Sequence, residues 1–122
     1  MLTVKELNVF YGAIHALKDI SLNVAKGEIV TLIGANGAGK STTLRALSGL
    51  IRPRSGTITF LGTSIEGQGA HKIVRGGLSH CPEGRRIFGR LTVRENLLLG
   101  AYFRKDKRQV ENDLARNFDL FP

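Results

Sequence analysis

Residues 34–42, Gly-Ala-Asn-Gly-Ala-Gly-Lys-Ser-Thr, combine glycines with a lysine and two hydroxyl side chains. The spacing is Gly34, four residues, then Gly39, Lys40 and Ser41. Glycines let the backbone turn with positive φ, so that its N–H groups can approach an oxyanion closely. The lysine would neutralise the β- and γ-phosphates of a nucleotide, and the serine hydroxyl would ligate Mg²⁺. The pattern therefore predicts a phosphate-binding loop, called the phosphate loop from here on.

The predicted site extends over the whole phosphate loop. Lys40 is predicted to act in catalysis as well as in binding, and Ser41 is the first predicted magnesium ligand. The loop residues predicted to bind the nucleotide are Gly34, Ala35, Asn36, Gly37, Ala38, Gly39, Lys40, Ser41 and Thr42.

The segments on either side of the loop have the patterns of a strand and a helix. Residues 28–34, "EIVTLIG", form a β-branched apolar run that is typical of a strand buried on both faces. After the loop, Leu44, Leu47 and Ile51 follow a helical spacing, and Gly49 is expected to end that helix. A phosphate loop requires this order of strand, loop and helix.

The N-terminal residues predict two strands joined by a turn, "LTVKELNVFYG" and "LKDISLNVAKGE". In the second, strict alternation puts Leu17, Asp19, Ser21 and Asn23 on one face and Ile20, Leu22 and Val24 on the other. The stretch "SGTITFLGTSI" predicts two further short strands about a turn at residues 61–63.

The C-terminal half predicts mainly helices. A short helix is expected in "GAHKIVRGG", followed by a short strand in "LSHCPEG". Thr92 and Glu95 form a capping box, which predicts a helix through "NLLLGAYF". The spacing of Val110, Leu114, Phe118 and Phe121 predicts a last helix over residues 107–122.

The composition is that of a globular chain without an apparent membrane span or signal peptide. The 122 residues suggest one domain at most, and 42% hydrophobic residues permit a packed core. No apolar run reaches the length of a membrane span, and the N-terminus lacks signal-peptide features. The single cysteine, Cys81, fits a reducing compartment, so a cytoplasmic location is expected. The net charge of +8 fits nucleic-acid binding, an anionic surface or an acidic portion elsewhere.

The stretches "LIGANGAGKSTTLRALSGL" and "SGTITFLG" resemble the nucleotide-binding domain of ABC transporters. The resemblance implies an α/β fold of the P-loop NTPase class, with an N-terminal antiparallel β-subdomain, and ATP with Mg²⁺ as ligands. Tyr11 occupies the family's aromatic position that stacks on adenine. From the residues alone, Tyr11 could equally be an aromatic side chain that caps the core.

Residues 81–102, "CPEGRRIFGRLTVRENLLLGAY", are similar to one branch of that family, the ATP-binding subunits of branched-chain amino-acid importers. Glu83 stands where the family generally has a glutamine that reaches for the metal and the attacking water. The resemblance implies a catalytic, Mg²⁺-binding role for Glu83, while the alternative is a surface turn residue. Arg85, Arg86 and Arg90 would touch a membrane partner's coupling helix or be solvated.

The resemblance implies a division of the chain. Residues 1–33 and 55–66 would form the β-subdomain and the strand before the phosphate loop, and residues 34–52 the loop and its helix. Residues 77–91 would correspond to the family's glutamine-bearing loop, and residues 92–122 would begin the helical subdomain. The Leu-Ser-Gly-Gly-Gln signature is absent, and no acidic residue follows a run of four apolar residues. We therefore expect the N-terminal half of such a domain, with weak or no ATPase activity alone.

The resemblance also implies partners and a location. These are a second ATP-binding subunit in a head-to-tail dimer, membrane permease subunits, and the inner face of the cell membrane. A small P-loop kinase-like protein is an alternative, whereas a GTPase would need Asn-Lys-x-Asp and Asp-x-x-Gly motifs, which do not occur. A basic nucleic-acid-binding module would explain the charge but not the glycine loop, so no nucleic-acid partner is expected.

Overall fold

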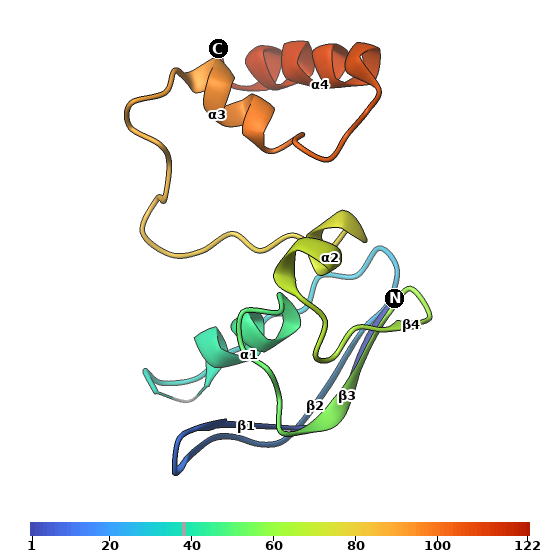
Figure 1. The fold of residues 1–122 in the computed structure, drawn as a ribbon, viewed down its shortest axis with the longest axis vertical. Helices are drawn as coiled ribbons and strands as arrows, with labels where there is room; N and C mark the ends of the chain where they lie inside the picture. Colours follow the sequence, from blue (N-terminus) through green and yellow to red (C-terminus); the bar gives the residue numbers. More distant parts are fainter. Residues whose placement is uncertain (38) are drawn as a thin grey trace. The chain divides into compact units, whose positions relative to one another are not determined.

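The computed structural model describes residues 1–37 and 39–122, which form two compact units, Met1–His80 and Cys81–Pro122 (Figure 1). The first unit is built from a small antiparallel sheet and two helices, and the second from two helices. None of the helices in these ranges is both long enough and apolar enough to span a bilayer.

The sheet of the first unit has the order β2-β1-β3-β4, and every pair is antiparallel. β1 (Leu2–Tyr11) lies between β2 (Ile14–Val24) and β3 (Ser55–Phe60), while β4 (Thr63–Ser64) pairs with β3. The predicted N-terminal strands and the turn before β4 are confirmed, and so is the antiparallel β-subdomain as part of an α/β fold.

The pairing of β1 with β2 shifts its register at three places, and residues with positive φ, Glu6 and Asp19, mark two of them as β-bulges. In β1 the buried side chains are Val4 and then Leu7, because Glu6 between them has a φ of 48°. Asp19 in β2 has the same φ of 48°. The side chain of Asn8 connects the two bulges: its Nδ2 donates to Glu6 O and Asp19 Oδ1, each at 2.9 Å. A bulge inserts one residue and so changes which side chains face the core.

The bulge at Asp19 corrects the predicted faces of β2. Leu17 is 1% exposed and belongs to the core, and Ile20, Leu22 and Val24 pack against that same core. Strict alternation had assigned Leu17 to the opposite face. The left-handed Asp19 adds one residue at the bulge, so the side chains before and after it exchange faces. A pattern of strict alternation cannot predict this exchange.

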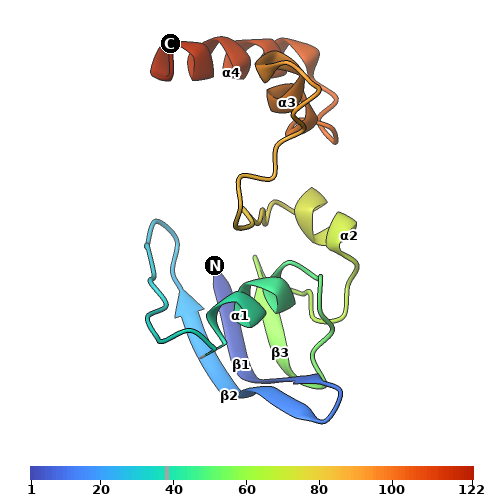
Figure 2. The same cartoon turned by 90° about the vertical axis from the view of Figure 1, so that its left-hand side faces the viewer.

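Helices α1 (Lys40–Leu47) and α2 (Ala70–Arg75) lie on one face of the sheet (Figures 1 and 2). Both helices were predicted, although α1 is shorter than its apolar spacing indicated: Leu44 is exposed and Ile51 lies beyond the last turn. The buried hydrophobic cluster of this unit consists of Leu2, Val4, Leu7, Val9, Leu17, Ala46, Leu47, Ile58, Ile65 and Ile73.

Two predicted strands do not form. Residues 28–34 have no regular structure, and Ile29 and Ile33 are 94% and 93% exposed. Residues 78–84 also form no strand, although Leu78 packs against the core. A strand needs a hydrogen-bonded neighbour, and neither segment pairs with the four strands of the described sheet. The apolar composition of these segments specifies burial without specifying a partner.

The second unit consists of α3 (Val93–Leu99) and α4 (Lys107–Leu120). The predicted capping box is present: Thr92 Oγ1 accepts from Glu95 N at 3.1 Å, and Thr92 N donates to Glu95 Oε2 at 2.7 Å. The structure thus confirms both predicted helices. Helix α3 ends at Leu99, earlier than its apolar run indicated.

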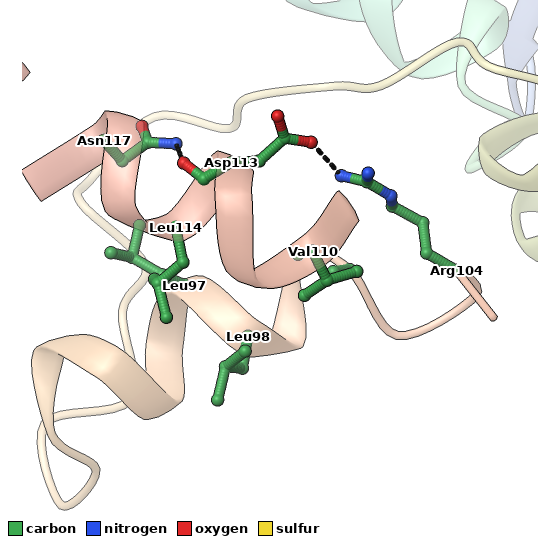
Figure 3. Close-up of a pocket in the computed structure, with 9 residues that line it drawn as sticks. Leu97, Leu98, Arg104, Val110, Asp113, Leu114 and Asn117 are labelled. Carbon is green, nitrogen blue, oxygen red and sulfur yellow. Dashed lines mark hydrogen bonds and ion pairs between the residues drawn. The ribbon is translucent and has the colours of Figure 1, made fainter. Parts of the chain in front are cut away.

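A hollow of about 120 Å³ lies between α3 and α4 (Figure 3). Leu97, Leu98 and Leu114 contribute apolar side chains to its lining. At its rim, Arg104 Nη1 lies 2.7 Å from Asp113 Oδ2, and both side chains are largely exposed. Such an exposed ion pair contributes little to stability, so the packing of the two helices depends mainly on the leucines.

The carboxylate of Glu66 gives the first unit a pH-dependent stability. Burial raises the pKa of Glu66, but hydrogen bonds outweigh it: Ile58 N donates to Oε2 at 3.0 Å and Ser64 Oγ to Oε1 at 3.3 Å. The net effect is a pKa below the ordinary value. A lowered native pKa adds stability above the unfolded pKa and loses it as pH falls through the native value.

We therefore expect Glu66→Gln to destabilise the chain near neutral pH and to have a smaller effect in acid, where the wild-type carboxylate is protonated. Urea unfolding of the wild type and of Glu66→Gln, at about pH 7 and about pH 3, measures the difference in the free energy of unfolding. The two stability curves should converge towards low pH, and parallel curves would contradict the assigned role.

Candidate phosphate-binding site

Helix α1 begins at Lys40, within the phosphate loop, and Gly39 makes the transition from the turn to the helix. Gly39 is the N-cap with φ 98°, a left-handed conformation that favours glycine. A Cβ on Gly39 would lie 2.6 Å from Leu17 Cδ2 and 3.3 Å from Ala16 O. Gly39 is therefore favoured by its φ, and a Cβ there would also displace the end of the Leu17 side chain.

The side chain of Lys40 folds back over the loop. Its Nζ donates to Gly34 O and, at 3.0 Å, to Ala35 O. The first N–H groups of a helix have no intrahelical acceptor and carry part of the helix dipole. Lys40 is the first residue of α1, so one short segment supplies both an ammonium group and these N–H donors, a combination that suits an anion such as a phosphate.

Tyr11, at the end of β1, contacts the first turn of α1. Its Oη lies 3.3 Å from Thr42 Oγ1, and the residue is 41% exposed. The neighbouring Phe10 is already engaged: its ring stacks on His15 with 4.0 Å between ring centroids, and Arg54 Cζ lies 3.7 Å from its centroid. Tyr11 is partly exposed and takes no part in these contacts of Phe10, and its stacking on adenine stays a prediction.

The structure brings part of the predicted set together. Hydrogen bonds connect Lys40 with Gly34 and Ala35, and Thr42 with Tyr11. The remaining loop residues that are described, Asn36, Gly37, Gly39 and Ser41, lie in the turn before α1 or in its first turn. Ala38 lies outside the described residues.

Glu83 belongs to the second unit, in an exposed segment before α3. Its main-chain oxygen accepts from Arg86 Nε at 3.2 Å. The end of this segment is held by Asn96, whose Oδ1 accepts from Phe88 N at 2.9 Å and whose Nδ2 donates to Thr92 O at 2.9 Å. The predicted magnesium role of Glu83 stays a prediction, as does a coupling-helix contact of the exposed Arg85, Arg86 and Arg90.

Two polar contacts near α1 were not predicted from the sequence. Thr43 Oγ1 donates to Gly39 O at 2.8 Å, which fastens the first turn. Ser48 Oγ lies 3.2 Å from His80 Nδ1 and donates to Leu44 O at 2.9 Å. Because the hydroxyl has one hydrogen, His80 is assigned as the donor to Ser48. No sequence signal pairs residues 32 positions apart.

The described residues do not group three His, Cys, Asp or Glu side chains around one point. The described residues therefore offer no cage made of such side chains for a metal ion. Mg²⁺ characteristically keeps several waters and binds phosphate oxygens rather than an all-protein cage.

Comparison with known proteins relates this chain to a family. The model of the ABC transporter family matches residues 17–120. The high-affinity branched-chain amino acid transport ATP-binding protein BraG of Pseudomonas aeruginosa is 49% identical over 100% of this chain and 52% of its own length. The lipopolysaccharide export system ATP-binding protein LptB of Haemophilus influenzae is 36% identical over 98% of this chain and 52% of its own.

A solved structure described as an ATP-binding subunit of an ABC transporter is 36% identical, with a TM-score of 0.81. The match covers 92% of this chain and 46% of that one. The chain spans about half the length of the curated relatives it matches.

Proposed function

Because the chain belongs to the ABC transporter family, we propose that residues 1–122 bind MgATP as part of the ATP-binding subunit of an importer. The triphosphate would lie on the N–H groups of the phosphate loop and of the first turn of α1. Lys40 would exchange its two carbonyl acceptors for phosphate oxygens, and Tyr11 would lie against the adenine.

One observation carries this proposal: an ammonium group and a helix N-terminus meet at a left-handed glycine. Lys40 Nζ is held by Gly34 O and Ala35 O, and Gly39 at φ 98° directs the chain into α1. The resulting cluster of donors is suited to the several oxygens of a polyphosphate.

Magnesium would supply charge neutralisation between the phosphates when it is bound. Ser41 fits a ligand role, because its side chain is exposed on the first turn of α1 and its hydroxyl is a hard oxygen donor. Glu83 is proposed as a further ligand, directly or through water. The Ser41 assignment predicts that chelating the metal weakens ATP binding more in the wild type than in Ser41→Ala.

We also propose that the complete protein supports uptake of branched-chain amino acids. The support is its greater identity to BraG than to LptB, 49% against 36%. The complete protein would form a head-to-tail dimer, hydrolyse ATP at the interface, and lie on the cytoplasmic face of the membrane against permease subunits. Disrupting its gene should lower uptake of labelled leucine, isoleucine and valine, with arginine uptake as the control.

Titration of the purified chain with MgATP, MgGTP and a short RNA tests the ligand class. We expect MgATP to bind to the folded chain, with its triphosphate on the phosphate loop and its base against Tyr11. Circular dichroism confirms folding in the same sample. A folded chain that leaves ATP unbound contradicts the proposal.

The same titration shows whether the basic charge of the chain serves to bind nucleic acid. RNA binding that is tighter than ATP binding, and that weakens steeply with salt, would favour the nucleic-acid alternative. Equal affinities for ATP and GTP would leave the phosphate site in place and would be compatible with stacking by Tyr11, because an aromatic ring stacks on either base.

A further inference from the structure

The hydrogen bond between Tyr11 and Thr42 connects two parts of the proposed site that would contact different parts of a nucleotide. Tyr11 Oη lies 3.3 Å from Thr42 Oγ1. Tyr11 is the last residue of β1, and Thr42 belongs to the first turn of α1. The aromatic ring would contact a base, whereas the N–H groups of that turn would contact phosphates. The Tyr11 hydroxyl can therefore have a role that is separate from the role of the ring.

The alternation of β1 directs Tyr11 toward α1. Leu7 and Val9 are fully buried beneath the helices, and residues at i and i+2 of a strand face the same side. Tyr11 continues this series, while Phe10 faces the other way, where His15 and Arg54 contact its ring. Core packing of Leu7 and Val9 fixes one face of the end of β1, and the contacts of Phe10 fix the other. The direction of Tyr11 toward Thr42 follows from these contacts.

The β1–β2 hairpin restrains the start of α1 at two points. Leu17 of β2 approaches Gly39 so closely that a Cβ there would lie 2.6 Å from Leu17 Cδ2. Tyr11, which pairs with Ile14 across the hairpin, reaches Thr42 one turn further along the helix. The first contact is apolar packing, and the second is a hydrogen bond that can be removed by deleting one oxygen atom.

We infer that the Tyr11 hydroxyl is a positioning group for the phosphate loop, an inference that rests on the proposed function. Its bond to Thr42 holds the first turn of α1 where the N–H groups of that turn face a phosphate. Without the bond, a smaller fraction of molecules has this arrangement, and the apparent affinity falls by the same factor. The effect concerns phosphate binding, so it does not require a base on the ligand.

Inorganic tripolyphosphate, which has no base, separates this role from stacking. Tyr11→Phe keeps the ring and removes only the hydroxyl. We expect it to weaken binding of both magnesium tripolyphosphate and MgATP by about three- to tenfold, the usual effect of one hydrogen bond. In a Thr42→Val background, Tyr11→Phe should change neither affinity by more than about 1.5-fold, because the partner oxygen is already absent.

Three results would overturn the inference. One is an unchanged tripolyphosphate affinity in Tyr11→Phe, and the second is an equal effect of Tyr11→Phe with and without Thr42→Val. The third is a lower urea midpoint for Tyr11→Phe that accounts for the whole loss of affinity, which would indicate a structural role. If the wild-type chain binds neither ligand, the proposed function itself fails, an outcome distinct from all three.

Discussion

Lys40→Ala is expected to weaken ATP binding by about 100-fold. Lys40 Nζ donates to Gly34 O and Ala35 O, so its ammonium group is already held over the loop in which the triphosphate would lie. Charge-assisted hydrogen bonds contribute about 1.5–3 kcal/mol each, and two of them to phosphate oxygens account for a loss of about 3 kcal/mol. Isothermal titration of MgATP into the two proteins measures the difference.

Lys26→Ala is a matched control for the loss of charge, because Lys26 is an exposed lysine in the turn after β2. It should leave the ATP affinity within about twofold at moderate salt, where distant charges are screened. Urea unfolding of Lys40→Ala shows whether the loop bonds also support the fold. If Lys40→Ala weakens ATP binding by less than about threefold, the phosphates do not lie where the proposal puts them.

Gly56→Ala is expected to lower the free energy of unfolding by about 4 kcal/mol. Gly56, in β3, has φ 96°, and a Cβ there would lie 2.5 Å from Glu6 O and 2.6 Å from Leu7 Cα. These are backbone atoms of the β1 bulge, so they cannot move aside as a flexible side chain would. The added methyl group would push β3 away from β1 and open the core between them.

Gly62→Ala measures the cost of a positive φ alone, without the steric overlap that a methyl group would meet at Gly56. Gly62, in the turn between β3 and β4, has φ 79°, and a Cβ there would have no atom within 4 Å. It should cost about 1 kcal/mol, the penalty of a left-handed alanine alone. Urea unfolding of the two variants gives the comparison. Equal losses would mean that the bulge yields to the methyl group, contrary to the close approach seen at Gly56.

Local signals in the sequence were sufficient for much of the fold. Thr92 and Glu95 specify the start of α3 by satisfying each other's N–H groups, an interaction contained within four residues. The short strands β3 and β4 follow from a turn with Gly62 between β-branched residues. The spacing of glycines, lysine and serine likewise predicted the phosphate loop, and the family to which the chain belongs agrees with it.

The sequence by itself thus determined the helices, the antiparallel strands and the family, because each depends on neighbouring residues or on a short motif. Only the tertiary structure decided which side chains meet. It showed that the Asp19 bulge puts Leu17 in the core, that residues 28–34 find no strand to pair with, and that Tyr11 bonds Thr42. Pairing partners, bulges and contacts between distant residues depend on how the elements pack, and an apolar pattern records only that a residue prefers burial.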